Sequence, residues 1–233
     1  MNPAPLPLRR FDLVIAPRHD QLPKCPNVVQ TIGALAKGLA EEERLQAQQR
    51  LRAHPRFSRN GGIEPIHPAV AVFIGGDTPH HALSTAFADS LIAQVKTACE
   101  TMGGVCLVTT SRRTSPAVER LLQERLSRDP RCRLLLLAGR DALDGTMEGM
   151  LASADVAVVT GESISMVSEA CASGRPVVVI APPARRDGHS TLTKHRRFLN
   201  DLVKDGHARL VPVAELDLAI RRALEAHQSP KGL

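Results

Sequence analysis

From residue 69 onward the chain alternates short, continuous apolar runs with longer runs that have helical spacing of their apolar positions. Continuous apolar runs are typical of strands buried on both faces, and the longer runs are typical of helices that cover them. This alternation predicts an α/β fold with a parallel, Rossmann-like sheet and helices on both faces. The predicted strands are 69–74, 105–109, 133–138, 156–160, 176–181 and 209–211, and the predicted helices are 84–102, 116–127, 145–154, 163–173, 193–205 and 215–227.

The chain before residue 69 has a less regular pattern. Two short apolar runs, 11–16 and 27–32, predict strands, and the run 40–52 is rich in good helix formers but sparse in apolar positions. We therefore expect a mostly solvated or connecting helix there. Residues 54–68 carry three prolines and two glycines, which predicts a linker. The expected organisation is an amino-terminal segment (1–53), a linker (54–68) and a main domain (69–228).

The amino-acid composition limits the kinds of ligand and partner that the chain can bind. Aromatic residues make up 2% of the chain, with no Trp or Tyr, which excludes an aromatic stacking surface for single-stranded nucleic acid. The net charge is +6, with short basic clusters at 112–113, 185–186 and 194–197. Such clusters are compatible with a solvated surface, a phosphorylated ligand or an anionic polymer or membrane. We expect no nucleic-acid partner and leave a peripheral membrane contact open.

The five cysteines show no metal-binding or redox spacing, and three of them fall in runs that read as buried. An odd count argues against a disulfide framework and favours a reducing compartment, so we expect a cytoplasmic protein. The chain shows no signal-peptide pattern and no run of about 18 apolar residues that could span a membrane. No cluster of His or Cys ligands and no paired-Asp motif predicts a metal site.

Candidate ligand-binding residues follow the predicted strands, because parallel sheets bind ligands beyond the carboxyl ends of their strands. Gly75 and Gly76 follow the first strand, where they allow either a close approach to a ligand or a plain tight turn. They lack the third glycine of a dinucleotide fingerprint, so an NAD site is unsupported. Ser111, Arg112 and Arg113 follow the next strand, and an arginine fork matches phosphate oxygens.

The strongest candidate is the strand-to-helix junction that contains Gly161, Ser163 and Ser165. Unpaired amides and the helix dipole at such a junction favour an anion such as a pyrophosphate. Glu162 would oppose an anion, so we expect it to face solvent or to accept a hydrogen bond from a backbone amide. Glu169 lies on the same helical face as Ser165 and could accept hydrogen bonds from two ribose hydroxyls, or be an ordinary exposed helical residue.

Only one candidate for a general base lies in the amino-terminal segment. His19 has a suitable pKa range, and Asp20 could orient it, although neighbours in a loop seldom orient each other. A structural or surface role is the alternative for both residues.

The helix at 163–173 and its flanks resemble the donor-binding helix of GT-B glycosyltransferases. As a set, five segments of the chain are similar to the mitochondrial-fission ELM family. This resemblance implies the carboxy-terminal half of a GT-B fold together with a remnant of the amino-terminal half. The matching segments are 12–20, 73–78, 107–114, 154–177 and 194–209.

The resemblance also implies roles for residues. Glu169 would hold the ribose, Ser163 and Ser165 with Gly75–Gly76 would cradle the diphosphate, and Arg112 or Arg113 would neutralise it. The segment 144–149 would contact the base. No metal or other cofactor is implied, because the nucleoside diphosphate sugar is itself the ligand.

The expected function is therefore nucleotide-sugar binding, with a metal-independent glycosyltransferase as the enzymatic form of this hypothesis. The alternatives are a non-enzymatic adaptor that binds a protein or membrane, and an inactive remnant. The two amino-terminal strands would have open edges, which leaves a homodimer open as well.

Overall fold

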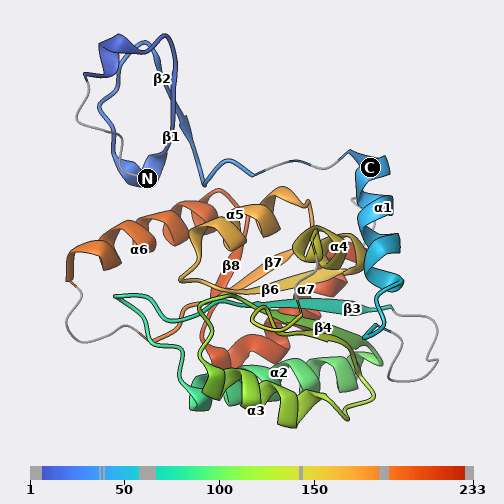
Figure 1. Cartoon of the computed structure of the whole chain (residues 1–233). Helices are drawn as coiled ribbons and strands as arrows, with labels where there is room; N and C mark the ends of the chain where they lie inside the picture. Colours follow the sequence, from blue (N-terminus) through green and yellow to red (C-terminus); the bar gives the residue numbers. More distant parts are fainter. Residues whose placement is uncertain are drawn as a thin grey trace.

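The computed structural model describes residues 7–36, 38, 40–57, 67–141, 144–183 and 189–228. Its main body is a six-stranded parallel sheet with the strand order β5-β4-β3-β6-β7-β8 (Figure 1). This confirms the α/β fold predicted from the alternation of apolar runs. The strands are β3 (Ala69–Ile74), β4 (Val105–Thr110), β5 (Cys132–Leu136), β6 (Val156–Thr160), β7 (Val177–Ile180) and β8 (Arg209–Val211).

Helices cover both faces of this sheet (Figure 1). One face carries α2 (Thr85–Met102), α3 (Pro116–Leu126) and α7 (Leu216–Gln228). The other face carries α4 (Thr146–Ser153), α5 (Ile164–Ala172) and α6 (His189–Lys204). The bounds of each of these helices lie within a few residues of a predicted helix.

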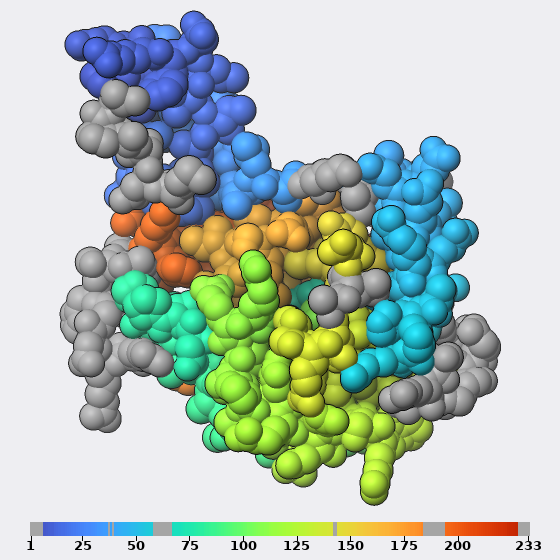
Figure 2. Space-filling view, in the orientation of Figure 1, coloured from blue at the N-terminus to red at the C-terminus, as the bar shows by residue number. Residues whose placement is uncertain are grey.

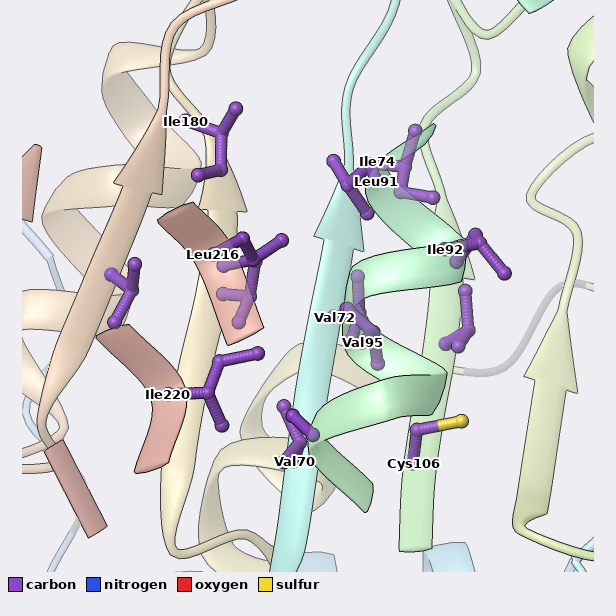
Figure 3. Close-up of a cluster of buried hydrophobic side chains, with 14 of the residues drawn as sticks. Val70, Val72, Ile74, Leu91, Ile92, Val95, Cys106, Ile180, Leu216 and Ile220 are labelled. Atoms are coloured by element: carbon purple, nitrogen blue, oxygen red, sulfur yellow. The ribbon is translucent and has the colours of Figure 1, made fainter. Parts of the chain in front are cut away.

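The apolar core consists of two clusters, one on each side of the sheet. Side chains of β3 alternate between them, as the pleat of a strand requires. Figure 3 shows the first cluster, where β3 contributes Val70, Val72 and Ile74 and helices α2 and α7 pack against it. Continuous apolar strands are therefore explained by burial on both faces.

Local signals fix several helix ends. The Ser84 hydroxyl accepts a hydrogen bond from the Phe87 amide (3.1 Å) and caps α2, as predicted. Gly174 and Gly206 follow α5 and α6 with φ of +74° and +75°, a backbone conformation that glycine adopts without strain.

The two amino-terminal strands pair with each other and not with the main sheet. β1 (Val14–Pro17) and β2 (Val28–Thr31) form a separate parallel pair, which projects from the main body in Figure 1. We call residues 7–32 the amino-terminal ribbon; it also includes the short 3₁₀ helices η1 (Leu8–Arg10) and η2 (Arg18–Asp20).

Contacts between η2 and helix α6 join the ribbon to the main body. Arg18 forms an ion pair with Asp205 (2.8 Å), which directly follows α6. Asp20 forms an ion pair with Lys194, and the ring of His19 lies edge-on to Phe198 with 5.1 Å between ring centroids.

Helix α1 (Glu41–Arg52) is largely exposed, as predicted, but one side of it packs against α4. Ala47 and Leu51 are the buried residues of this helix. A Cβ at Gly149 of α4 would lie 2.8 Å from the Ala47 carbonyl oxygen, so the two helices require glycine at their contact. Residues 58–66 of the predicted linker lie outside the described residues, and the proposed domain boundaries stay a prediction.

Two further expectations concern cysteines and membrane spans. The five cysteines are free thiols, and Cys99, Cys106 and Cys132 are buried among apolar side chains, as their runs predicted. Among the described helices, none is both long and apolar enough to cross a bilayer.

Leu51 tests whether α1 is anchored to the main body. Leu51→Ala should lower the free energy of unfolding by about 2–5 kcal/mol, because a side chain that is 1% exposed leaves a cavity against α4. Leu45→Ala on the same helix is the matched control, since Leu45 is 50% exposed and should change stability by less than about 0.5 kcal/mol. Urea unfolding followed by circular dichroism measures both. Equal effects of the two substitutions would mean that α1 does not pack as described.

Candidate functional site

Gly75 and the junction between β6 and α5 lie in direct contact at the carboxyl edge of the sheet. The Gly75 amide donates a hydrogen bond to the Thr160 hydroxyl (2.8 Å), and that hydroxyl donates to Glu162 Oε1 (3.0 Å). A Cβ at position 75 would overlap the Glu162 carboxyl. Gly161 is buried, and its amide donates a hydrogen bond to the Ile180 carbonyl oxygen (2.8 Å), which continues the sheet. Glycine at position 75 therefore makes room for Glu162.

The position of Glu162 decides between two expectations. We expected it to face solvent or to accept a hydrogen bond from a backbone amide; the side chain is buried, with 2% of the residue exposed, and it accepts hydrogen bonds from the Gly76 amide and from its own amide. Burial raises the pKa of Glu162, and hydrogen bonds from Thr160 and the Gly76 amide, together with the Arg113 charge, lower it by less. Burial thus disfavours the charged form of this carboxyl. Among the described residues, no hydrogen-bond partner is found for its Oε2 atom.

The loop after β4 packs against Gly76. A Cβ at position 76 would overlap the Arg113 carbonyl group, and the Thr114 hydroxyl donates a hydrogen bond to the Gly75 carbonyl. Ser111 Oγ accepts a hydrogen bond from the Arg113 amide (3.2 Å) and so shapes the turn. The side chains of Arg112 and Arg113 are exposed at this edge of the sheet. The structure thus brings Gly75, Gly76, Arg113 and Glu162 together.

Helix α5 begins without a side-chain cap. Ser163 occupies the N-cap position and is buried, yet its hydroxyl accepts no amide hydrogen bond; it lies 3.4 Å from the Ser165 hydroxyl. The amides of Ile164, Ser165 and Met166 belong to the first turn, where no intrahelical acceptor exists. Within the described part of the chain, no other acceptor is found for them. This helix start can therefore donate hydrogen bonds to an anion.

Two histidines lie beside the start of α5. His195 Nε2 lies 3.1 Å from the Glu162 carbonyl oxygen, and the His81 ring lies 5.7 Å from the His195 ring. Burial, and then the neighbouring His195 and His80, lower the pKa of His81, so its imidazole is held neutral. His195 stands in the basic cluster 194–197, but no pattern in the sequence pairs it with His81, because His81 precedes α2 and His195 lies in α6, far away in the chain.

His19 and Asp20 do not form a hydrogen-bonded pair among the described contacts. His19 is 5% exposed and packs on Phe198, while Asp20 pairs with Lys194. Burial lowers the pKa of His19; the charges of Lys194 and His195 add to this, and Asp20 opposes it. A catalytic role of these two residues stays a prediction.

Glu169 lines a cavity of about 420 Å³ beside α5. The carboxylate is half-buried, and burial, followed by repulsion from Glu148, raises its pKa. The cavity walls come from α5, α4, α1 and residues 35, 36 and 38, which no pattern in the sequence indicates as neighbours. The lining residues are Leu35, Ala36, Gly38, Arg44, Met147, Glu148, Leu151, Ala152, Glu169, Ala172, Ser173 and Gly174.

The segment before α1 crosses α5 next to this cavity. The Ala34 amide donates a hydrogen bond to Ser168 Oγ (3.0 Å), and a Cβ at Gly33 would overlap the same hydroxyl. Ser165 and Glu169 lie on the adjacent face of α5, one helical turn apart, which is about 6 Å along the axis. Figure 2 shows α5 (orange) between the ribbon (blue) and the helix pair α4 and α1 (yellow and cyan).

A metal centre has no support in this region. Within the described residues, no group of three or more His, Cys, Asp or Glu side chains has the geometry to hold a metal ion.

The chain matches a family model described as Mitochondrial fission ELM1 over residues 1–228. The mitochondrial fission protein ELM1 of Arabidopsis thaliana is 28% identical over 195 residues, which cover 74% of this chain and 43% of that protein. The chain thus spans less than half the length of this relative.

Similar solved structures are more distant. A glycotransferase of kitacinnamycin has 17% identity and a TM-score of 0.44, over 93% of this chain and 51% of its own. The FMN-dependent cysteine decarboxylase TvaF has 14% identity and a TM-score of 0.42, over 69% of this chain and 98% of its own. Likenesses of this size carry no conclusion about function.

Gly76 tests the packing of the two loops. Gly76→Ala should lower the free energy of unfolding by about 1–3 kcal/mol, because the added methyl group meets backbone atoms that cannot rotate away. Gly38→Ala is the control, since a Cβ there meets no atom within 4 Å. Thermal or urea unfolding measures the stability of the two variants against the wild-type protein. A Gly76→Ala protein as stable as the control would show that the loops are farther apart than described.

Proposed function

The chain belongs to the Mitochondrial fission ELM1 family, and from this premise we propose that it binds a nucleoside diphosphate sugar along one face of helix α5. The observation that carries the proposal is that this face combines two kinds of group. Its start offers unpaired amides, and Glu169 lies one turn further on in a cavity.

The diphosphate would bind at the start of α5. The first-turn amides and the positive end of the helix dipole favour an anion there. Exposed Arg112 and Arg113 follow β4, and Arg113 is close enough to influence the charge of Glu162 at the junction before α5. Guanidinium groups in this position would neutralise phosphate oxygens in a bidentate fashion.

The nucleoside would occupy the cavity. Glu169 is an acceptor-only group when ionised, and two neighbouring ribose hydroxyls are donors that match its two oxygens. The cavity volume of about 420 Å³ lies within the range of small-molecule sites, and most of its lining residues are apolar or small. The ribose carboxylate and the phosphate-binding amides share one helix, so their separation is fixed by the helical rise.

Transfer of the sugar would be the enzymatic form of this function. It would proceed without a protein-bound metal, with the Arg side chains and the α5 amides stabilising the departing diphosphate. His19 is the candidate base, because burial holds its imidazole in the neutral, proton-accepting form. Asp20 is paired with Lys194, and its charge raises the pKa of His19 against the effect of burial.

One observation favours a second candidate function, a non-enzymatic adaptor. The apolar side chains of Leu13, Ile15 and Val29 are 56%, 47% and 51% exposed, and Ile15 and Val29 pair directly across the ribbon. Contiguous exposed apolar groups mark interaction surfaces more often than chance exposure does. On this alternative the ribbon binds a protein or a membrane.

Isothermal titration calorimetry tests nucleotide binding. Wild-type protein should bind at least one of UDP, GDP and ADP, and Glu169→Gln should weaken that binding about tenfold or more, a loss of about 1.4 kcal/mol. The control is Glu215→Gln, an exposed residue away from the cavity. Absence of heat with every diphosphate and its sugars would contradict the proposal.

Sedimentation with vesicles that contain anionic phospholipid tests the membrane form of the adaptor alternative. If the ribbon binds the bilayer, Ile15→Asp should lower the bound fraction, because a charged side chain costs free energy in an apolar contact. Glu169→Gln should bind vesicles like the wild type. Failure of the wild-type protein to sediment with the vesicles would remove this form of the alternative.

A further inference from the structure

The geometry points to guanine as the base that the cavity selects, so that the ligand class is a guanosine diphosphate sugar. This inference rests on the proposed function and adds Glu148 as its specificity-determining residue. Glu148 lies on α4 and lines the same cavity as Glu169, next to apolar walls from Met147, Leu151 and Leu35.

Among the described residues, the carboxylate of Glu148 takes part in no hydrogen bond and no ion pair, and the residue is half-buried. Glu148 is close enough to Glu169 for the two carboxylates to repel each other. A ligand that brings hydrogen-bond donors to both groups would offset this repulsion.

The two carboxylates differ in what lies around them. Glu169 projects from the face of α5 that leads to the unpaired amides, which assigns it to the ribose. Glu148 lines the same cavity from α4, together with apolar side chains that can pack on a flat ring. The base would therefore meet Glu148, and the ribose would meet Glu169.

A carboxylate distinguishes the bases by the order of donors on their edges. It can only accept hydrogen bonds. Guanine presents two adjacent donors, N1–H and the exocyclic amino group, which match the two carboxylate oxygens as an arginine fork does. Uracil flanks its N3–H with two carbonyl oxygens, whereas adenine and cytosine place an acceptor nitrogen beside the amino group. These acceptors would face the carboxylate and repel it.

Arg44 completes the match. Arg44 lines the same cavity, and its Nη1 donates a hydrogen bond to Glu41 Oε2 (3.3 Å), which leaves other N–H groups of its guanidinium to donate. Guanine carries an acceptor, O6, next to N1–H. Glu148 and Arg44 together offer groups of the right kind to all three positions of that edge.

The first experiment compares diphosphates that differ only in the base. GDP should bind at least about tenfold more tightly than UDP and ADP, since a polar site left unpaired rejects analogues strongly. Inosine diphosphate, which lacks the exocyclic amino group, should fall between GDP and the others. Calorimetry at one salt concentration gives the four dissociation constants.

The second experiment uses Glu148→Gln, with Glu124→Gln, exposed on α3, as the matched control. The amide offers one donor and one acceptor, so Glu148→Gln should lose the preference for GDP while keeping the affinity for UDP. Glu169→Gln should weaken all four diphosphates alike, because every ribose makes the same contact. The control should behave as the wild type.

The outcomes separate the two proposals. If the four diphosphates bind equally, or if Glu148→Gln keeps the GDP preference, the assignment of guanine is wrong and the nucleotide site stands. If no diphosphate binds the wild-type protein, the proposed function itself fails and the inference fails with it.

Discussion

Helix α5 presents two kinds of group on one face. At its start, the amides of Ile164, Ser165 and Met166 have no acceptor within the described part of the chain, and the half-buried Glu169 carboxylate follows Ser165 by four residues. A helix dipole and unpaired first-turn amides favour an anion, and a carboxylate favours hydroxyl or amine donors. Both kinds of group are fixed on one rigid element, so any ligand that satisfies both must carry an anion and donors at a matching distance. The rest of the site acts on this helix. Glu162 and Thr160 connect its start to Gly75, and residues of α4, of α1 and of positions 35, 36 and 38 line the cavity beside Glu169.

The sheet supplies the rigidity that this arrangement needs. Six parallel strands with apolar side chains on both faces place the loops after β3, β4 and β6 at one edge. The glycines of the first loop are required by contacts within the protein, with Glu162 at position 75 and with the Arg113 backbone at position 76. Those contacts hold the arginine loop near the start of α5 without any ligand.

Much of this could be predicted from the sequence, because the signals were local. The strands Ala69–Ile74 and Val156–Thr160 coincide with their apolar runs, and the Ser84 cap follows from residue type and position. The burial of Glu162 could not be predicted, since it depends on a glycine from a loop far away in the chain. The other residues that line the cavity could not be predicted for the same reason. Only Glu169 and the segment 144–149 were expected to contact a ligand, on the basis of the family resemblance. The parallel pairing of β1 with β2 likewise depends on contacts between segments, which the hydrophobic periodicity of the sequence does not show.

The measurement that tests the central claim most directly is an amide NMR titration with a nucleoside diphosphate. The account predicts that the amide resonances of Ile164, Ser165 and Met166 shift on titration, and that their shifts give the same dissociation constant as calorimetry does. The resonances of β1 and β2 should stay in place. Saturable binding that leaves these three amides unshifted would contradict it, because the phosphates would then lie elsewhere on the protein.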